Sequence, residues 1–167
     1  MSNEAAAPNA KAPDKAALRN ELESTRAAFH ALLDSLSEAD WKKKSANAAW
    51  SVGQLMWHLG FGMDFFPRAI EYCRKGTGPN PPAFVIGIGN VMITRFGSRG
   101  ATPRSASEKY DEGNAKLLSL LDSIGDDEWS KSARIYQNDY TIAKLFPEVT
   151  VHFREHEADI LKGLGRL

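Results

Sequence analysis

The chain has almost no cysteine and no excess of charge of either sign. Its single cysteine, Cys73, has no partner within the chain, so an internal disulfide is excluded. Lys and Arg together number 21, and so do Asp and Glu. No basic excess is therefore present to attract a nucleic acid backbone or an anionic bilayer. We expect neither nucleic acid nor a membrane as a partner.

Long apolar runs and leader-like segments are also missing. Residues 1–15 consist largely of Ala, Asn, Pro and Lys without an apolar centre, unlike a signal peptide. The stretch with the least charge, residues 79–94, is interrupted by prolines and glycines and falls short of a membrane span. We predict a disordered segment at residues 1–14, one domain over residues 15–167, and a cytoplasmic protein.

Apolar residues recur at helical spacing in four segments, which indicates four amphipathic helices. The segments cover residues 15–36, 51–74, 105–124 and 141–164. Between them, no alternation of apolar and polar residues is long enough for a strand, so we expect no sheet. The predicted fold class is all-α, a four-helix bundle.

Capping residues and a proline indicate where the second and third helices begin and where the second is interrupted. Ser51 is followed three residues later by Gln54, which predicts a capping box, and Ser105 with Glu108 predicts another. Pro67 lies inside the second helical segment. Its ring removes a backbone donor and clashes with the preceding turn, so we expect a kink or a division of the helix there.

The two halves of the chain resemble each other at an offset of 88 residues. Residues 32–36, Leu-Leu-Asp-Ser-Leu, correspond to residues 120–124, Leu-Leu-Asp-Ser-Ile, and Asp40-Trp41 corresponds to Glu128-Trp129. The repeat predicts two pseudo-equivalent helical hairpins around an approximate two-fold axis, with the second helix of each facing the other. Trp41 and Trp129 should then occupy equivalent connections.

Three of the four histidines lie on these two facing helices. His58 is seven residues past the cap Ser51, whereas His152 and His156 are eleven and fifteen past Thr141. These intervals differ by fours, so the three imidazoles should project from the same face of each helix and converge. Three neutral imidazoles can hold one divalent metal and leave a coordination position open, as catalytic sites do. Without metal, their nitrogens should lie within about 4 Å of one another.

Two further ionisable residues are interpreted beside the three histidines. Glu148 lies one turn before His152, where its carboxylate could be a fourth ligand, an acceptor for an imidazole N–H or a general base. It could equally be an ordinary acid near the start of the helix, stabilised by the helix dipole. His30 lacks the common register, and we assign it to packing or to the surface.

These motifs resemble the DinB/YfiT-like superfamily of metal-dependent enzymes. The resemblance rests on Trp-Ser-Val-Gly-Gln-Leu-x-x-His-Leu at residues 50–59 and on His-x-x-x-His at residues 152–156. It implies a DinB-like four-helix bundle, often dimeric, with a three-histidine metal site at His58, His152 and His156. Family members include S-transferases and a maleylpyruvate isomerase that use thiols such as mycothiol or bacillithiol. Where the family often has Arg-Gly-Gln after the last histidine, this chain has Glu-Ala-Asp at residues 157–159.

The resemblance implies an enzyme in which a metal-activated thiol or water attacks a small electrophilic substrate, as an S-transferase or a hydrolase does. We expect zinc or nickel first and iron or manganese next, a low-molecular-weight thiol as cosubstrate, and a homodimer. The alternatives are a metal or small-ligand binding bundle without turnover, and a structural bundle whose histidines are vestigial. An enzyme should have a pocket that opens on the metal, whereas a storage or structural site should be closed.

Residues 84–96 form an unusual apolar segment that contains glycines. We favour a buried helix in a third layer, or a short helix that closes the end of the bundle. The alternative is a lid or pocket wall over the metal, since Gly87 and Gly89 permit close approach or hinge motion.

Overall fold

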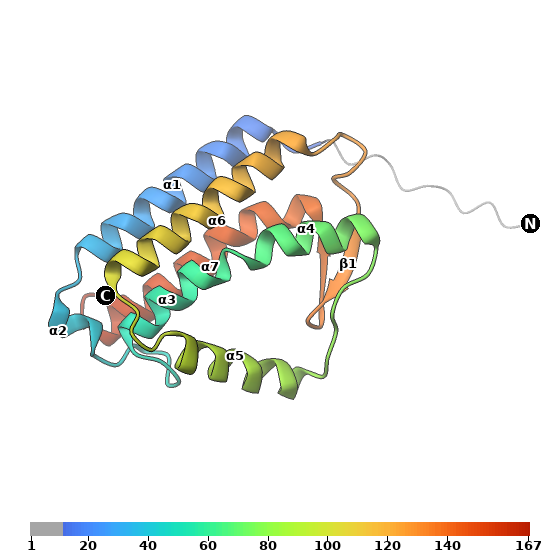
Figure 1. Cartoon of the computed structure of the whole chain (residues 1–167). Helices are drawn as coiled ribbons and strands as arrows, with labels where there is room; N and C mark the ends of the chain where they lie inside the picture. The colour runs from blue at the N-terminus through green and yellow to red at the C-terminus, as the bar shows by residue number, and fades with distance from the viewer. Residues whose placement is uncertain (1–11) are drawn as a thin grey trace, which may run out of the picture.

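The computed structural model describes residues 12–167, and helices account for most of it. Four long helical segments lie side by side (Figure 1). They are α1 (Lys15–Asp34), α3 (Val52–Gly62) continued by α4 (Phe65–Lys75), α6 (Pro103–Ser123) and α7 (Ile142–Gly163). The all-α four-helix bundle is thereby confirmed. None of the described helices combines the length and the apolar character needed to cross a bilayer.

The helix starts follow from local hydrogen bonds. The disordered segment predicted at residues 1–14 lies mostly outside the described residues, which begin at residue 12. Asp14 is the N-cap of α1, and its carboxylate accepts from the backbone N–H groups of Ala16 and Ala17. The capping box of α3 is confirmed, since the side chains of Ser51 and Gln54 each accept from the other's backbone N–H. The predicted cap of α6 was wrong. Thr102 is the N-cap, because Pro103 suits the first helical position, where no donor is lost.

The expected break near Pro67 is confirmed. The helix divides at residues 63–64, and Pro67 is the third residue of α4, where its missing N–H has no intrahelical acceptor to lose. Division of this segment allows α3 to lie against α6 and α7, while α4 also contacts the strands described next.

A two-stranded antiparallel hairpin leads into α7, so the expectation of no sheet was wrong here. Its strands are β1 (Ser132–Ile135) and β2 (Asn138–Thr141). The turn residues Tyr136 and Gln137 have φ values of 47° and 70°. This left-handed geometry usually favours Asn or Gly, so the sequence carries no common hairpin signal. The turn is held instead by residues 79–80, whose oxygens accept from both turn amides at 2.8 and 2.7 Å.

The two halves follow the predicted repeat of helix, connection and helix. The first connection contains the short helix α2 (Glu38–Trp41), and the second contains the β1–β2 hairpin. Trp41 packs so closely on the first turn of α3 that a Cβ at Gly53 would overlap its indole. Trp129 packs on the start of α7, where its ring centroid lies 5.8 Å from that of Phe146. Each indole therefore covers the beginning of the helix that follows it.

Helix α5 (Ala83–Gly97) stands outside the four-helix bundle, beside α3 (Figure 1). Our preference for a buried or end-closing helix was wrong. Its large side chains are exposed, with Phe84 at 70% and Ile88 at 62% of their full accessible area. Contact with the bundle comes from its C-terminal part, where Thr94 is buried and Gly97 lies against the Trp57 ring.

The core fixes the rotation of α7. Phe153 is buried beside Phe29, whose ring stacks on that of Tyr110 at a centroid distance of 4.0 Å. Val149 and Ile160 are buried as well. With these side chains held in the core, His152 and His156 are turned toward α3.

Candidate metal centre

His58 from α3 meets His152 and His156 from α7. Their ring centroids lie 4.8 to 5.2 Å apart. The Nε2 atoms of His58 and His152 are separated by 3.3 Å, and one nitrogen from each of the three lies within 4.8 Å of the others. The largest distance between these ring nitrogens exceeds the predicted 4 Å. The three histidines nevertheless converge on one place, as predicted.

The chemistry and spacing of these nitrogens fit a divalent ion. Two nitrogens bound tetrahedrally to zinc at about 2.05 Å lie about 3.3 Å apart, which is the spacing of His58 Nε2 and His152 Nε2. The most distant pair in the set would have to close by up to about 1.5 Å to reach the same spacing. The described residues contain no other cluster of three side chains so placed.

Two polar side chains contact the Nδ1 atoms of His58 and His156 and orient these rings. His58 Nδ1 lies 3.3 Å from the hydroxyl of Thr94, a fully buried residue of α5. His156 Nδ1 lies 3.3 Å from Oδ2 of Asp159, one turn further along α7. An ionised carboxylate can only accept, so Asp159 favours the proton on Nδ1 of His156, and the Thr94 hydroxyl favours the same tautomer of His58 when it accepts from Nδ1–H. In that tautomer Nε2 is left free to bind a metal.

Close packing restricts the rings further. Trp50 stacks on His58 with centroids 4.8 Å apart and an interplanar angle of 29°. Gly62, four residues after His58, has no side chain, and a Cβ there would approach Cε1 of His152 to 3.2 Å. Glycine at residue 62 therefore leaves room for the imidazole, which a larger residue would displace.

Burial keeps two of the imidazoles neutral. It lowers the pKa of His58 to about 4 and that of His152 to about 3, and the nearby His156 acts in the same direction. Only neutral imidazole can bind a metal. At pH 7 these two side chains therefore need not lose a proton before an ion binds.

A cleft of about 530 Å³ opens onto His58 and His152. Its walls come from α3, α4, α5, α7 and the hairpin turn. Helix α5 contributes Val85, Ile86, Gly89, Asn90 and Ile93. The segment that we expected to be buried is therefore a wall of the cleft beside the histidines, as its alternative interpretation required.

Glu148 lines the same cleft, one turn before His152 on α7. Burial raises the pKa of Tyr140, and the charge of Glu148 acts in the same direction. Thr94, Asp159 and Gly62 were missed by sequence reasoning. Asp159 could have been found from its spacing of three residues after His156, whereas Thr94 lies 36 residues from His58.

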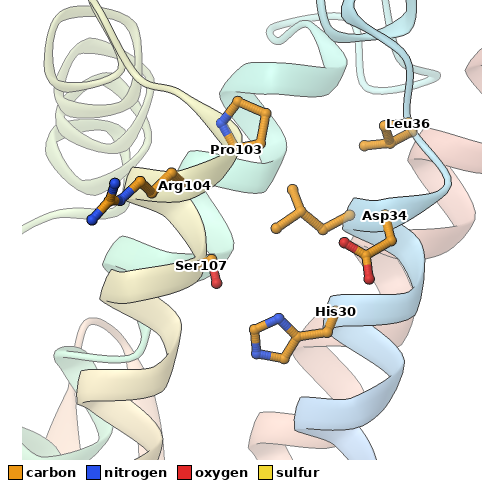
Figure 2. Close-up of a pocket in the computed structure, with 7 residues that line it drawn as sticks. His30, Asp34, Leu36, Pro103, Arg104 and Ser107 are labelled. Carbon is orange, nitrogen blue, oxygen red and sulfur yellow. The ribbon is translucent and has the colours of Figure 1, made fainter.

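His30 lies apart from the three histidines, as predicted. Its Nε2 is 2.8 Å from Asp111 on α6, and it is partly buried. It borders a separate hollow of about 400 Å³ between α1 and α6 (Figure 2). Figure 2 shows His30 and Asp34 on one side of this hollow and Arg104 and Ser107 on the other. No second histidine lines it.

Known proteins share this architecture. YfiT from Bacillus subtilis, a probable metal-dependent hydrolase with an unusual four-helix bundle topology, superposes with a TM-score of 0.72 at 14% identity, covering 99% of this chain and 92% of that one. The mycothiol-dependent maleylpyruvate isomerase superposes with a TM-score of 0.70 at 13% identity. The match covers 89% of this chain and 61% of the isomerase, and a variant of that enzyme gives the same values.

At such low identity the structural similarity shows the fold alone. No curated protein matches the sequence. The model of one protein family, however, matches residues 21–159, which include all three clustered histidines. The chain belongs to the DinB superfamily.

Proposed function

We propose that the protein is a metal-dependent enzyme that promotes attack of a thiol or water on a small electrophilic substrate. The observation that supports this most directly is the cleft, which gives a small molecule access to His58 and His152. A site for metal storage or structural support is usually closed to solvent ligands. An open cleft of this size is instead typical of small-molecule sites.

His58, His152 and His156 would hold the ion through ring nitrogens. A bound divalent ion lowers the pKa of a thiol or water, so that the deprotonated nucleophile forms near neutral pH. Thr94 and Asp159 keep the His58 and His156 rings oriented through their Nδ1 atoms. Trp50 covers one face of the His58 ring and limits its access to water.

Glu148 is the proposed proton acceptor. It shares a face of α7 with His152 and lines the cleft, so a nucleophile bound there can reach its carboxylate. Asp64 also lines the cleft but is engaged by Lys109 at 3.1 Å and by Lys116 at 3.5 Å. Glu148 therefore suits the role better than Asp64.

We propose a low-molecular-weight thiol as the preferred nucleophile, with water as the alternative, and zinc or nickel as the metal. The mycothiol-dependent isomerase and the hydrolase-like YfiT, both similar in fold, support these two reaction classes. Three imidazoles suit several first-row metals, so availability in the cell contributes to the choice.

Metal analysis followed by an activity assay tests this function. Protein purified without a polyhistidine tag should contain about one divalent ion per chain. It should then transfer mycothiol or bacillithiol to 1-chloro-2,4-dinitrobenzene, or hydrolyse p-nitrophenyl acetate, faster than the His58→Ala variant. Stoichiometric metal without turnover of either substrate class would instead favour the non-catalytic binding bundle.

We also propose that the protein forms a homodimer through the outward face of α5. Phe84, Ile88, Met92 and Phe96 recur every fourth residue, and each is at least 45% exposed. The four side chains are uncharged, and the Arg99 guanidinium lies 4.3 Å from the Phe96 ring centroid at one end of the stripe. Two copies can therefore bury Phe84, Ile88 and Met92 across a two-fold axis. Sedimentation velocity should report a dimer for the wild type and a monomer for Ile88→Glu. A monomeric wild type would contradict the proposal.

A further inference from the structure

The wall of the cleft is mostly aromatic and aliphatic. Five aromatic rings line it, and α5 adds three branched side chains on the opposite side. The rings belong to Phe61, Phe65, Phe66, Tyr72 and Tyr136, and the branched side chains to Val85, Ile86 and Ile93. Such a surface stabilises an apolar body by removing it from water, and flat rings can stack on its aromatic side chains.

One cation borders this apolar space. Arg68, exposed on α4, is the only Lys or Arg among the residues that line the cleft. It makes no ion pair within 4.0 Å with any acidic residue of the described part of the chain. The carboxylate of Asp64, four residues earlier, is instead held by lysines of α6. Arg68 is thus available to a ligand.

The negative charges of the cleft restrict where an anion can bind. In the metal-free protein, Glu148 on α7 would repel an anionic group near the histidines. The guanidinium of Arg68 presents several donors in a planar fork that matches carboxylate, sulfonate and phosphate oxygens. An anionic group is therefore favoured at Arg68, with the remainder of the ligand along the apolar wall.

We infer that the substrate class is an amphipathic anion, with an aromatic or branched apolar body and one anionic group bound by Arg68. The body lies between α5 and the aromatic side chains of α3 and α4, and its far end approaches the histidines. Only the assignment of that far end as the reacting end rests on the proposed function. Recognition by the apolar wall and Arg68 is independent of it.

Calorimetric titration with two matched probes tests the inference on the full chain. Naphthalene-2-sulfonate is anionic, whereas methyl 2-naphthyl sulfone has nearly the same shape without charge. The wild type should bind the sulfonate at least about threefold more tightly than the sulfone. Arg68→Gln should abolish this preference and leave binding of the sulfone unchanged. Arg95→Gln, an exposed arginine of α5 outside the cleft, should retain the preference.

A second pair of variants tests whether binding occurs in the cleft. Ile93 of α5 and Val151 of α7 are both exposed aliphatic residues, at 51% and 47%, but only Ile93 lines the cleft. Ile93→Ser should weaken binding of both probes, whereas Val151→Ser should weaken neither. Equal affinity of the wild type for the two probes would overturn the inference, as would an equal effect of the two serine variants.

The same titrations after chelator treatment separate this inference from the proposed function. The preference for the sulfonate should persist without metal, because Arg68 carries it. If the protein binds no metal yet shows the Arg68-dependent preference, the proposed function fails and the inference stands. If it binds metal and turns over a substrate but shows no preference, the inference alone fails.

Discussion

Asp40 and Glu128 occupy equivalent places in the two halves of the protein, and each is held by an arginine from the opposite half. Arg166 Nη2 donates to Asp40 Oδ2 at 2.7 Å, and Arg74 Nε donates to Glu128 Oε1 at 3.0 Å. Both arginines follow or end the second helix of their own half. Each ion pair joins the connection between the two helices of one half to the end of the second helix of the other half, which agrees with an approximate two-fold axis.

The local contacts of the two carboxylates also match. Asp40 accepts from the backbone N–H three residues earlier at 3.1 Å, and Glu128 does the same at 3.1 Å. A lysine three residues later reaches each of them, Lys43 at 2.9 Å and Lys131 at 3.3 Å. The repeat seen in the sequence therefore extends to individual hydrogen bonds.

Loss of one of these arginines should destabilise the fold. Arg74→Met should lower the free energy of unfolding by about 1–2 kcal/mol, because Glu128 is largely shielded from solvent and loses charged hydrogen bonds. Arg166→Met should act in the same direction. Urea denaturation measures both changes. Arg104→Met is the control, since its pair with Glu108 is exposed and its loss should have no measurable effect.

Stability should fall in acid because of Glu128. Hydrogen bonds from Arg74, followed by the backbone N–H of Gly125, lower the pKa of Glu128 from 4.5 to about 2. Between these values the unfolded chain binds a proton that the folded protein does not, so stability is retained above about pH 4.5 and lost as pH falls toward 2.

Glu128→Gln should reduce this acid dependence. Unfolding free energies measured in urea at several pH values between 6 and 2.5 should show a shallower slope for the variant than for the wild type. Glu108→Gln provides the matched control, because that carboxylate is exposed on α6. An identical slope for Glu128→Gln and the wild type would contradict the assignment.

The bundle and the three histidines could be predicted because their signals are local. Capping residues set the helix register, and counting from Ser51 and Thr141 was enough to place all three imidazoles on facing stripes. The hairpin could not be predicted, since the left-handed turn at Tyr136 and Gln137 depends on hydrogen bonds that its amides donate to oxygens of residues 79–80.

The position of α5 depends on the other helices rather than on its own residues. An apolar segment ordinarily predicts burial, but here one part of it lines a cleft and another faces outward. The contact between Thr94 and His58 joins this helix to the histidine cluster. Nothing in the spacing of residues 58 and 94 could have indicated it.

Thr94 should support metal binding by orienting His58. Thr94→Val keeps the shape of the side chain and removes the hydroxyl, so affinity for zinc should fall by about tenfold or more. Competition with a chromophoric chelator measures the affinity. Thr25→Val is the matched control, because Thr25 is also buried and hydrogen-bonded, to Thr150 and away from the histidines. Equal zinc affinities for the two valine variants would argue against the role.

Asp159 should act on His156 in the same way. Asp159→Ala removes the carboxylate 3.3 Å from His156 Nδ1, and we expect a loss of about tenfold or more in zinc affinity. Asp159→Asn should retain part of that affinity, because its amide oxygen can still accept from Nδ1–H. If Asp159→Ala binds zinc as tightly as the wild type, the carboxylate has no orienting role.

Thermal melts with and without chelator test the central claim, that His58, His152 and His156 bind one metal together. Metal at a thousandfold excess over its Kd should add about 4 kcal/mol to stability, so chelation should lower the Tm of the wild type substantially. His58→Ala and His152→Ala should lose most of this response, although these residues are far apart in the sequence, whereas His30→Ala should keep it. A wild type insensitive to chelator, or a His58→Ala variant as sensitive as the wild type, would contradict the three-histidine site.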